Sequence, residues 1–158
     1  MYFLHGISNP DEADRKIKAW ADEAKSGGKI RFFGFSTHSN MEECLLGAAK
    51  LGWIDGIMFT YNFRVMHTEE MKKAVDECYK AGIGLTAMKT QATGWGTKRG
   101  PLSDKERALL NRFETKGLSA EQAKLKAVWD DNRIASICSY MTNMKVLKEN
   151  ASAAMDSK

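Results

Sequence analysis

The sequence is poor in cysteine and contains no long apolar run. Its three cysteines, Cys44, Cys78 and Cys138, are far apart and show no CxxC spacing, which argues against a disulfide framework and against a cysteine metal site. No apolar stretch approaches the roughly 18 residues that a membrane helix requires. The first six residues lack the basic and apolar regions of a signal peptide. We therefore expect reduced thiols, a cytoplasmic location and no membrane partner.

A contiguous basic stripe is also missing. The chain carries 24 Lys and Arg residues against 20 Asp and Glu residues, for a net charge of +4, but the two signs are mixed. Runs such as 11–16, 69–73 and 103–107 combine acids and bases, as solvated helix faces do. Nucleic acid is therefore not an expected partner. With 43% hydrophobic residues in 158, the composition is that of a single folded domain spanning 1–158.

Short apolar runs alternate with amphipathic segments along the chain. The runs that predict strands are 2–5, 29–36, 54–61, 83–88 and 134–139. The segments that predict helices are 12–25, 40–51, 68–81, 103–115, 120–131 and 143–155. Strict alternation predicts a parallel sheet, because each crossover helix returns the chain to the same edge. A glycine-rich loop at 91–101 interrupts the order, and its Trp95 is a candidate either for covering a ligand or for anchoring the loop.

Two α/β architectures fit this order, an open doubly wound sheet and a closed barrel. A dinucleotide-binding open sheet usually carries GxGxxG after its first strand, whereas here the residues are His5-Gly6-Ile7-Ser8. Polar residues instead follow strand after strand: His5, then 36–38, then 61–62, then 89–90, then 139–140. A ring of polar strand ends is typical of the active-site face of a TIM-type barrel. We predict a parallel (β/α) barrel that is present only in part, as about five βα units.

Several segments, taken in order, resemble the aldo-keto reductase family. Residues 2–5 are similar to the family's strand that ends in the active-site histidine, and 28–37 resemble its "GKIRxIGxSN" segment. The similarity continues with "QxxYN" at 58–62, "GIxVxAY" at 82–89 and "lxEN" at 147–151. The resemblance covers almost the whole chain. It implies an oxidoreductase that reduces a small aldehyde or ketone with NADP or NAD as cofactor.

The resemblance implies roles for residues at the catalytic and nicotinamide end. His5 matches the histidine that orients or polarises the substrate carbonyl. Ser36 and Thr37 fall where a Ser-Asn pair holds the nicotinamide carboxamide, so Thr37 is a departure. Met58 stands where a Gln usually contacts that amide. Met88 stands where a Tyr often stacks on the nicotinamide ring, and its thioether can still pack on a ring.

The resemblance also implies roles at the adenosine end. Glu149 and Asn150 match positions that contact adenosine. Tyr140 aligns with a basic residue that commonly binds the 2′-phosphate of NADP, which leaves NAD and NADP open. No metal ligands are predicted.

The family's catalytic Asp, Tyr and Lys lie on strands upstream of the histidine, whereas His5 is the fifth residue of this sequence. General acid catalysis needs a donor within hydrogen-bond reach of the carbonyl oxygen. We therefore expect a C-terminal fragment of a barrel that is inactive alone. The alternative is a non-catalytic partial barrel that binds nucleotide or dimerises. A third hypothesis is a lyase that uses Lys89 as a Schiff-base amine.

Five parallel strands cannot close an eight-stranded barrel. Two sheet edges and an apolar inner face would stay open. We expect either the missing strands or a second copy, as a homo-oligomer, to cover them.

Overall fold

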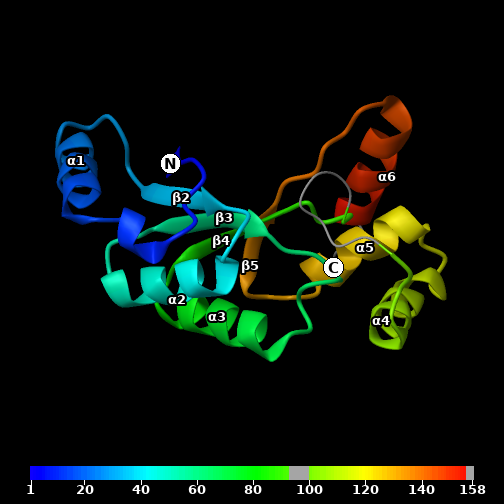
Figure 1. Ribbon diagram of the computed structural model, residues 1–158. Helices are drawn as coiled ribbons and strands as arrows, with labels where there is room; N and C mark the ends of the chain where they lie inside the picture. Colours follow the sequence, from blue (N-terminus) through cyan, green and yellow to red (C-terminus); the bar gives the residue numbers. More distant parts are fainter. Residues whose placement is uncertain (93–99, 156–158) are drawn as a thin grey trace. The chain divides into compact units, whose positions relative to one another are not determined.

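The computed structural model of the chain describes residues 1–92 and 100–155. Strands and helices alternate along these residues in the predicted order (Figure 1). The strands are β1 (Tyr2–Leu4), β2 (Phe33–Thr37), β3 (Gly56–Thr60), β4 (Gly84–Met88) and β5 (Ile134–Ile137). The helices are η1 (Pro10–Glu12, a 3₁₀ turn), α1 (Arg15–Ser26), α2 (Met41–Leu51), α3 (Glu69–Lys80), α4 (Asp104–Glu114), α5 (Ala120–Trp129) and α6 (Met144–Met155). Trp95, singled out in the sequence, lies outside the described residues.

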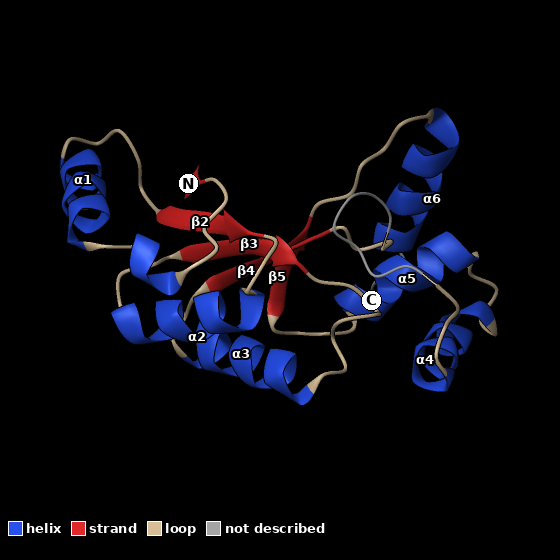
Figure 2. Ribbon diagram, in the orientation of Figure 1, coloured by secondary structure: helices blue, strands red, loops and turns tan. Residues whose placement is uncertain are grey.

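The strands form one parallel sheet in the order β1-β2-β3-β4-β5 (Figure 2). Along its ladders, Phe3 pairs with Gly34 and Ser36 pairs with Met58. A doubly wound sheet reverses its strand order at a switch point, whereas here every crossover steps in the same direction, as in a barrel. The sheet formed by the described residues is not closed, and the predicted parallel α/β fold is confirmed.

The first helix begins later than the sequence pattern predicts. Asn9 and Glu12 form a capping box that closes the short turn η1. The α-helix starts only at Arg15, behind Asp14, whose carboxylate accepts the N–H groups of Lys16 and Ile17 at 2.8 and 2.9 Å. Two successive caps thus divide a stretch that apolar periodicity treats as one helix, because side-chain oxygens satisfy the free N–H groups at two points.

The described residues belong to two compact units, one comprising Met1–Phe59 with Thr68–Thr86 and the other Thr60–His67 with Ala87–Lys158. In the first unit, α2 and α3 lie side by side (Figure 2). Its core includes buried apolar side chains from β2 and β3 together with apolar side chains from these helices: Phe33, Phe35, Ile57, Phe59, Leu45, Met71 and Val75.

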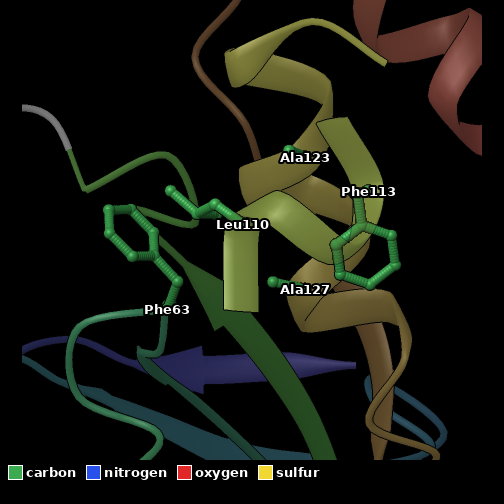
Figure 3. Close-up of a cluster of buried hydrophobic side chains, with 5 residues drawn as sticks. All are labelled: Phe63, Leu110, Phe113, Ala123 and Ala127. Carbon is green, nitrogen blue, oxygen red and sulfur yellow. The ribbon is translucent and has the colours of Figure 1, made fainter. Parts of the chain in front are cut away.

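The second unit has a core cluster around α4 and α5. Its buried members are Phe63, Leu110, Phe113, Ala123 and Ala127 (Figure 3). Figure 3 shows the two alanines on α5 and the ring of Phe113 beside Ala127. Small side chains on α5 leave room for the larger ones of α4, which is how two helices reach close packing.

The start of α5 depends on a capping box at Ser119. The Ser119 hydroxyl accepts the Gln122 N–H at 3.3 Å, and the Gln122 side chain accepts the Ser119 N–H at 2.9 Å. We expect Ser119→Ala to lower the free energy of unfolding by about 1 kcal/mol, because one N–H of the first turn loses its partner. Urea denaturation would measure this, with Ser152→Ala on the exposed face of α6 as control. An equal loss of unfolding free energy in both variants would contradict the role of Ser119 as the cap of α5.

Candidate active site

His5 and Ser36 meet at neighbouring strand ends in the first unit. The distance from His5 Nδ1 to Ser36 Oγ is 3.0 Å. The N–H of Gly6 donates to the same hydroxyl oxygen at 3.1 Å, and the N–H of Ile7 donates to the Ser36 carbonyl at 2.9 Å. Because β1 and β2 pair in parallel, their carboxyl ends lie at the same edge. Parallel pairing therefore brings together two residues that are 31 positions apart in the sequence.

This contact can fix the imidazole in one tautomer. Ser36 is buried, and its hydroxyl has one hydrogen and two lone pairs, of which Gly6 uses one. When the hydroxyl donates its hydrogen to Nδ1, the ring hydrogen resides on Nε2. The side chain of His5 is exposed, so a carbonyl oxygen can approach that N–H. The arrangement can therefore orient or polarise a carbonyl group.

Two further predicted residues lie beside Ser36. Met58 is half-buried on β3, directly across the ladder from Ser36. The buried Thr37 donates its hydroxyl hydrogen to the carbonyl of Ser39 at 2.9 Å. The Thr37 hydroxyl is thus left only as an acceptor, which limits what it can offer a carboxamide.

In the second unit, the turn after β4 has a strained backbone. Lys89 and Ala92 both have positive φ, at 53° and 55°, and the N–H of Ala92 donates to the Lys89 carbonyl at 2.8 Å. The buried Asn62 donates to the same carbonyl at 3.2 Å. The hydroxyl of Thr90 is buried and has no hydrogen-bond partner among residues 1–92 and 100–155. Such strain tends to persist where the surrounding structure enforces it, often at functional sites.

Gln91, the third residue of this turn, closes a ring of three hydrogen bonds. Its Nε2 donates to Asn150 Oδ1 at 3.2 Å, Asn150 Nδ2 donates to Ser139 Oγ at 2.9 Å, and Ser139 Oγ donates to Gln91 Oε1 at 3.1 Å. The three side chains come from the turn after β4, the segment after β5 and helix α6. We call this group the Gln91–Ser139–Asn150 ring.

A pocket of about 240 Å³ opens beside this ring, and Ser139 and Asn150 are part of its lining. The remaining walls are apolar and come from α5, β5, the segment after β5 and α6: Leu125, Trp129, Ile137, Met141, Leu147 and Ala151. Apolar walls with a few fixed polar groups are the usual composition of a small-molecule site. A flat heteroaromatic ring fits this chemistry, because its faces can lie against the walls while its edge reaches the amide and the hydroxyl.

The other residues predicted to contact cofactor are less closely tied to this pocket. Tyr140 is 87% exposed. Glu149 is half-buried and its carbonyl accepts Gln122 Nε2 at 3.3 Å. Met88 is half-buried and its carbonyl accepts the N–H of Tyr61 at 3.0 Å. Sequence reasoning noted Ser139 only as a polar strand end and missed Gln91, for which the sequence offers no signal.

Tyr61, another polar strand-end residue, is a structural group rather than an acid. It is fully buried and donates to Asp131 Oδ2 at 2.6 Å. Burial raises the pKa of Tyr61 far above its usual value, and the adjacent Asp131 carboxylate raises it further. Because its hydroxyl hydrogen is engaged with Asp131 and the side chain is inaccessible, the phenol is not available to protonate a bound carbonyl oxygen.

Two classes of site are not found among the described residues. Across 1–92 and 100–155, no group of three His, Cys, Asp or Glu side chains is placed to hold a metal ion. None of the helices in that part of the chain is long and apolar enough to cross a membrane. Its cysteines are free thiols, with Cys44 and Cys78 buried and Cys138 exposed.

Comparison with known proteins identifies the fold. No protein-family model and no curated protein matches the sequence. Among solved structures, the thermostable aldo-keto reductase Tm1743, in complex with the inhibitor epalrestat, matches 97% of this chain with a TM-score of 0.66 and 21% identity. The holo form of the aldo-keto reductase AKR11C1 from Bacillus halodurans matches with the same coverage, TM-score and identity. A Pseudomonas aeruginosa protein bearing the same family name matches 98% of the chain with a TM-score of 0.65 and 18% identity.

The chain spans about half the length of these structures, 54%, 52% and 50% respectively. The match confirms the predicted fold, a parallel β/α barrel present in part, which is the fold of these aldo-keto reductase structures.

Proposed function

We propose that this chain is the C-terminal part of an aldo-keto reductase, an oxidoreductase that reduces an aldehyde or ketone with NADP or NAD. The observation that carries the proposal is the contact of His5 with Ser36 at the ends of two adjacent parallel strands. An exposed imidazole with a fixed ring orientation suits the positioning of a carbonyl oxygen. The fold itself is compatible with other activities, so the proposal depends on this site.

We propose a nicotinamide dinucleotide as cofactor, on the residues that the resemblance assigns to it. We assign the nicotinamide end to Ser36, Thr37, Met58 and Met88, and the adenosine end to Tyr140, Glu149 and Asn150. The pocket beside Asn150 supports the second assignment, because its apolar walls and its amide suit a purine base. When bound, the reduced dinucleotide supplies the hydride. His5 donates a hydrogen bond to the carbonyl oxygen and so orients it.

Among the described residues, we assign no donor for the proton of the reduced oxygen. Tyr61 is buried and its hydroxyl hydrogen is donated to Asp131, and the family resemblance assigns this role to strands that precede the one ending in the histidine. We therefore propose that this chain alone binds nucleotide without turnover. The complete reaction belongs to the whole barrel, whose substrate is a small carbonyl compound.

The first test is a fluorescence titration of this chain with NADPH and NADH, together with an assay of carbonyl reduction. We expect saturable binding and no turnover by the chain, and turnover once the upstream strands are joined to it. If the chain binds neither NADPH nor NADH, the proposal is overturned.

In the complete barrel, His5→Ala is expected to lower kcat/KM about 10²-fold, in the range for loss of a positioned proton-transfer or polarising group. The dissociation constant for NADPH should stay within about twofold. His38→Ala, at the end of the adjacent strand, is the matched control and should leave both values unchanged. Equal losses in the two variants would contradict a specific role for His5.

One observation favours the alternative of a non-catalytic partial barrel. Tyr2 on the edge strand β1 is 41% exposed, and its ring lies 5.0 Å from that of Trp20, which is 45% exposed. Such an apolar surface on the edge strand of the sheet that the described residues form favours association with further strands or with a second copy. The mass of the native protein in solution distinguishes the enzyme from the non-catalytic partial barrel. A dimer of this chain that binds NADPH without turnover would favour the alternative, whereas a single chain of about twice the length would favour the enzyme.

A further inference from the structure

We propose that Gln91 is a positioning residue for the adenosine end of the nucleotide, acting through Asn150. The inference rests on the proposed function and extends it, because no resemblance assigns Gln91 a role. The observation behind it is the closed ring of hydrogen bonds that joins Gln91 to Ser139 and Asn150.

The ring couples the direction in which the Asn150 amide faces to that of the Gln91 amide. Gln91 and Asn150 each donate one hydrogen bond and accept one within it, as does the Ser139 hydroxyl. Turning over either amide alone would set two oxygens, or two NH₂ groups, against each other. The two amides can therefore reverse only together, so Gln91 and Asn150 are conformationally coupled.

The ring also leaves Asn150 able to bind a ligand. An amide has two N–H groups and two carbonyl lone pairs, and the ring uses one of each on Asn150. Asn150 and Ser139 line the 240 Å³ pocket, whereas Gln91 is absent from its lining. Gln91 thus acts on the pocket indirectly, by holding the two residues that line it.

The backbone at Gln91 supports a fixed position for its side chain. Lys89 and Ala92, two residues before it and one after it, both adopt left-handed conformations that cost non-glycine residues free energy. The Asn62 side chain holds the Lys89 carbonyl at the start of this turn. The turn therefore presents Gln91 in one conformation before any nucleotide binds, and such preorganisation lowers the entropy cost of binding.

The test compares Gln91→Met, which keeps the length of the side chain and removes both hydrogen bonds, with the unaltered chain. Binding of NADPH and of 2′,5′-ADP, which carries only the adenosine end, is measured by titration. We expect both dissociation constants to rise about three- to tenfold, the loss that one or two neutral hydrogen bonds produce. Ser139→Ala breaks the same ring and should have a similar effect. Thr90→Val, at the adjacent residue, removes a hydroxyl that has no described partner and should change neither constant.

A second readout is independent of nucleotide. The side-chain NH₂ protons of Asn150 should exchange slowly with solvent, as followed by NMR, in the unaltered chain and in Thr90→Val. Their exchange should be faster in Gln91→Met, because the Asn150 oxygen then loses the hydrogen bond from Gln91 that helps to hold the side chain in the ring. A purely structural role for Gln91 would lower stability without changing the dissociation constants at temperatures where the variant is folded.

The outcomes separate the inference from the function on which it rests. If the unaltered chain binds NADPH and Gln91→Met binds it equally well, the inference is wrong and the proposed function stands. If the unaltered chain binds none of NADPH, NADH and 2′,5′-ADP, the proposed function fails and the inference fails with it, even where the NMR measurement shows that the ring exists. If it binds NADH alone, the same comparison of Gln91→Met is made with NADH.

Discussion

Replacing Glu106 by alanine is expected to lower the free energy of unfolding by about 3–5 kcal/mol, the cost of breaking a buried ion pair from one side. The side chains of Glu106 and Arg64 are only 3% and 10% exposed, and their charged atoms are 3.5 Å apart. The Glu106 carboxylate also accepts the N–H of Ser103 at 2.7 Å and so caps helix α4. The substitution removes this cap and leaves a guanidinium without its carboxylate partner.

Arg64 contributes to the same part of the fold through backbone carbonyls. It donates to the Gly100 carbonyl at 2.8 Å and to the Pro101 carbonyl at 3.5 Å. A double-mutant cycle with Arg64→Met and Glu106→Gln, followed by urea denaturation at neutral pH, would measure the coupling between the two side chains. Asp22→Ala breaks the exposed pair of Lys18 and Asp22 and should cost less than about 1 kcal/mol. A similar small cost for Glu106→Ala would show that this buried pair does not hold the start of α4.

The second large effect is expected at Asp131. This carboxylate accepts hydrogen bonds from Tyr61 and from two side-chain nitrogens of Arg133, at 2.6 to 2.8 Å, and its side chain is 7% exposed. Asp131→Asn removes the charge that faces Arg133 and weakens the bond from the buried phenol. We expect a loss of about 3 kcal/mol at pH 7, which urea denaturation would measure.

The pH dependence of that loss gives a sharper test. Burial by itself would raise the pKa of Asp131, but the hydrogen bonds from Arg133 and Tyr61 outweigh it and hold the pKa below its usual value. A carboxyl whose pKa is lowered on folding stabilises the protein above its unfolded-state pKa of about 3.9. That contribution is lost as the pH falls from there through the lower folded-state pKa.

The gap in stability between the unaltered chain and Asp131→Asn should therefore be constant from about pH 5 to 7 and should shrink below about pH 4. Tyr61→Phe serves as control, because it removes one hydrogen bond and keeps the carboxylate. It should leave a pH-dependent contribution, reduced in size. A gap that stays constant down to pH 3 would mean that Asp131 is not a stabilising carboxylate in the folded chain.

Much of the fold could be predicted because its signals are local. The alternation of apolar runs with amphipathic segments gave the order of strands and helices. Thr68, Ser103 and Ser119 cap their helices through side-chain oxygens within three residues of the N–H groups they accept. The predicted start of α1 was wrong, because residues 9–14 contain two consecutive helix caps, Asn9 and Asp14. The spacing of apolar residues indicates neither cap.

The candidate site was predictable in part for the same reason. His5 and Ser36 each lie at the end of an apolar run, and a parallel sheet places such ends at one edge. Their residue types and the family resemblance then suggested the chemistry. The hydrogen bond between them, and with it the orientation of the imidazole, appears only in three dimensions.

By itself, the sequence determined the alternating α/β order, the parallel sheet and the polar strand ends, because strand periodicity, helix caps and crossover length are properties of short stretches of chain. Only the tertiary structure decided that Gln91 meets Ser139 and Asn150, 48 and 59 residues away, and that Tyr61 meets Asp131, 70 residues away. A hydrogen bond forms between side chains a few ångströms apart, and which distant side chains come that close depends on how the whole chain packs.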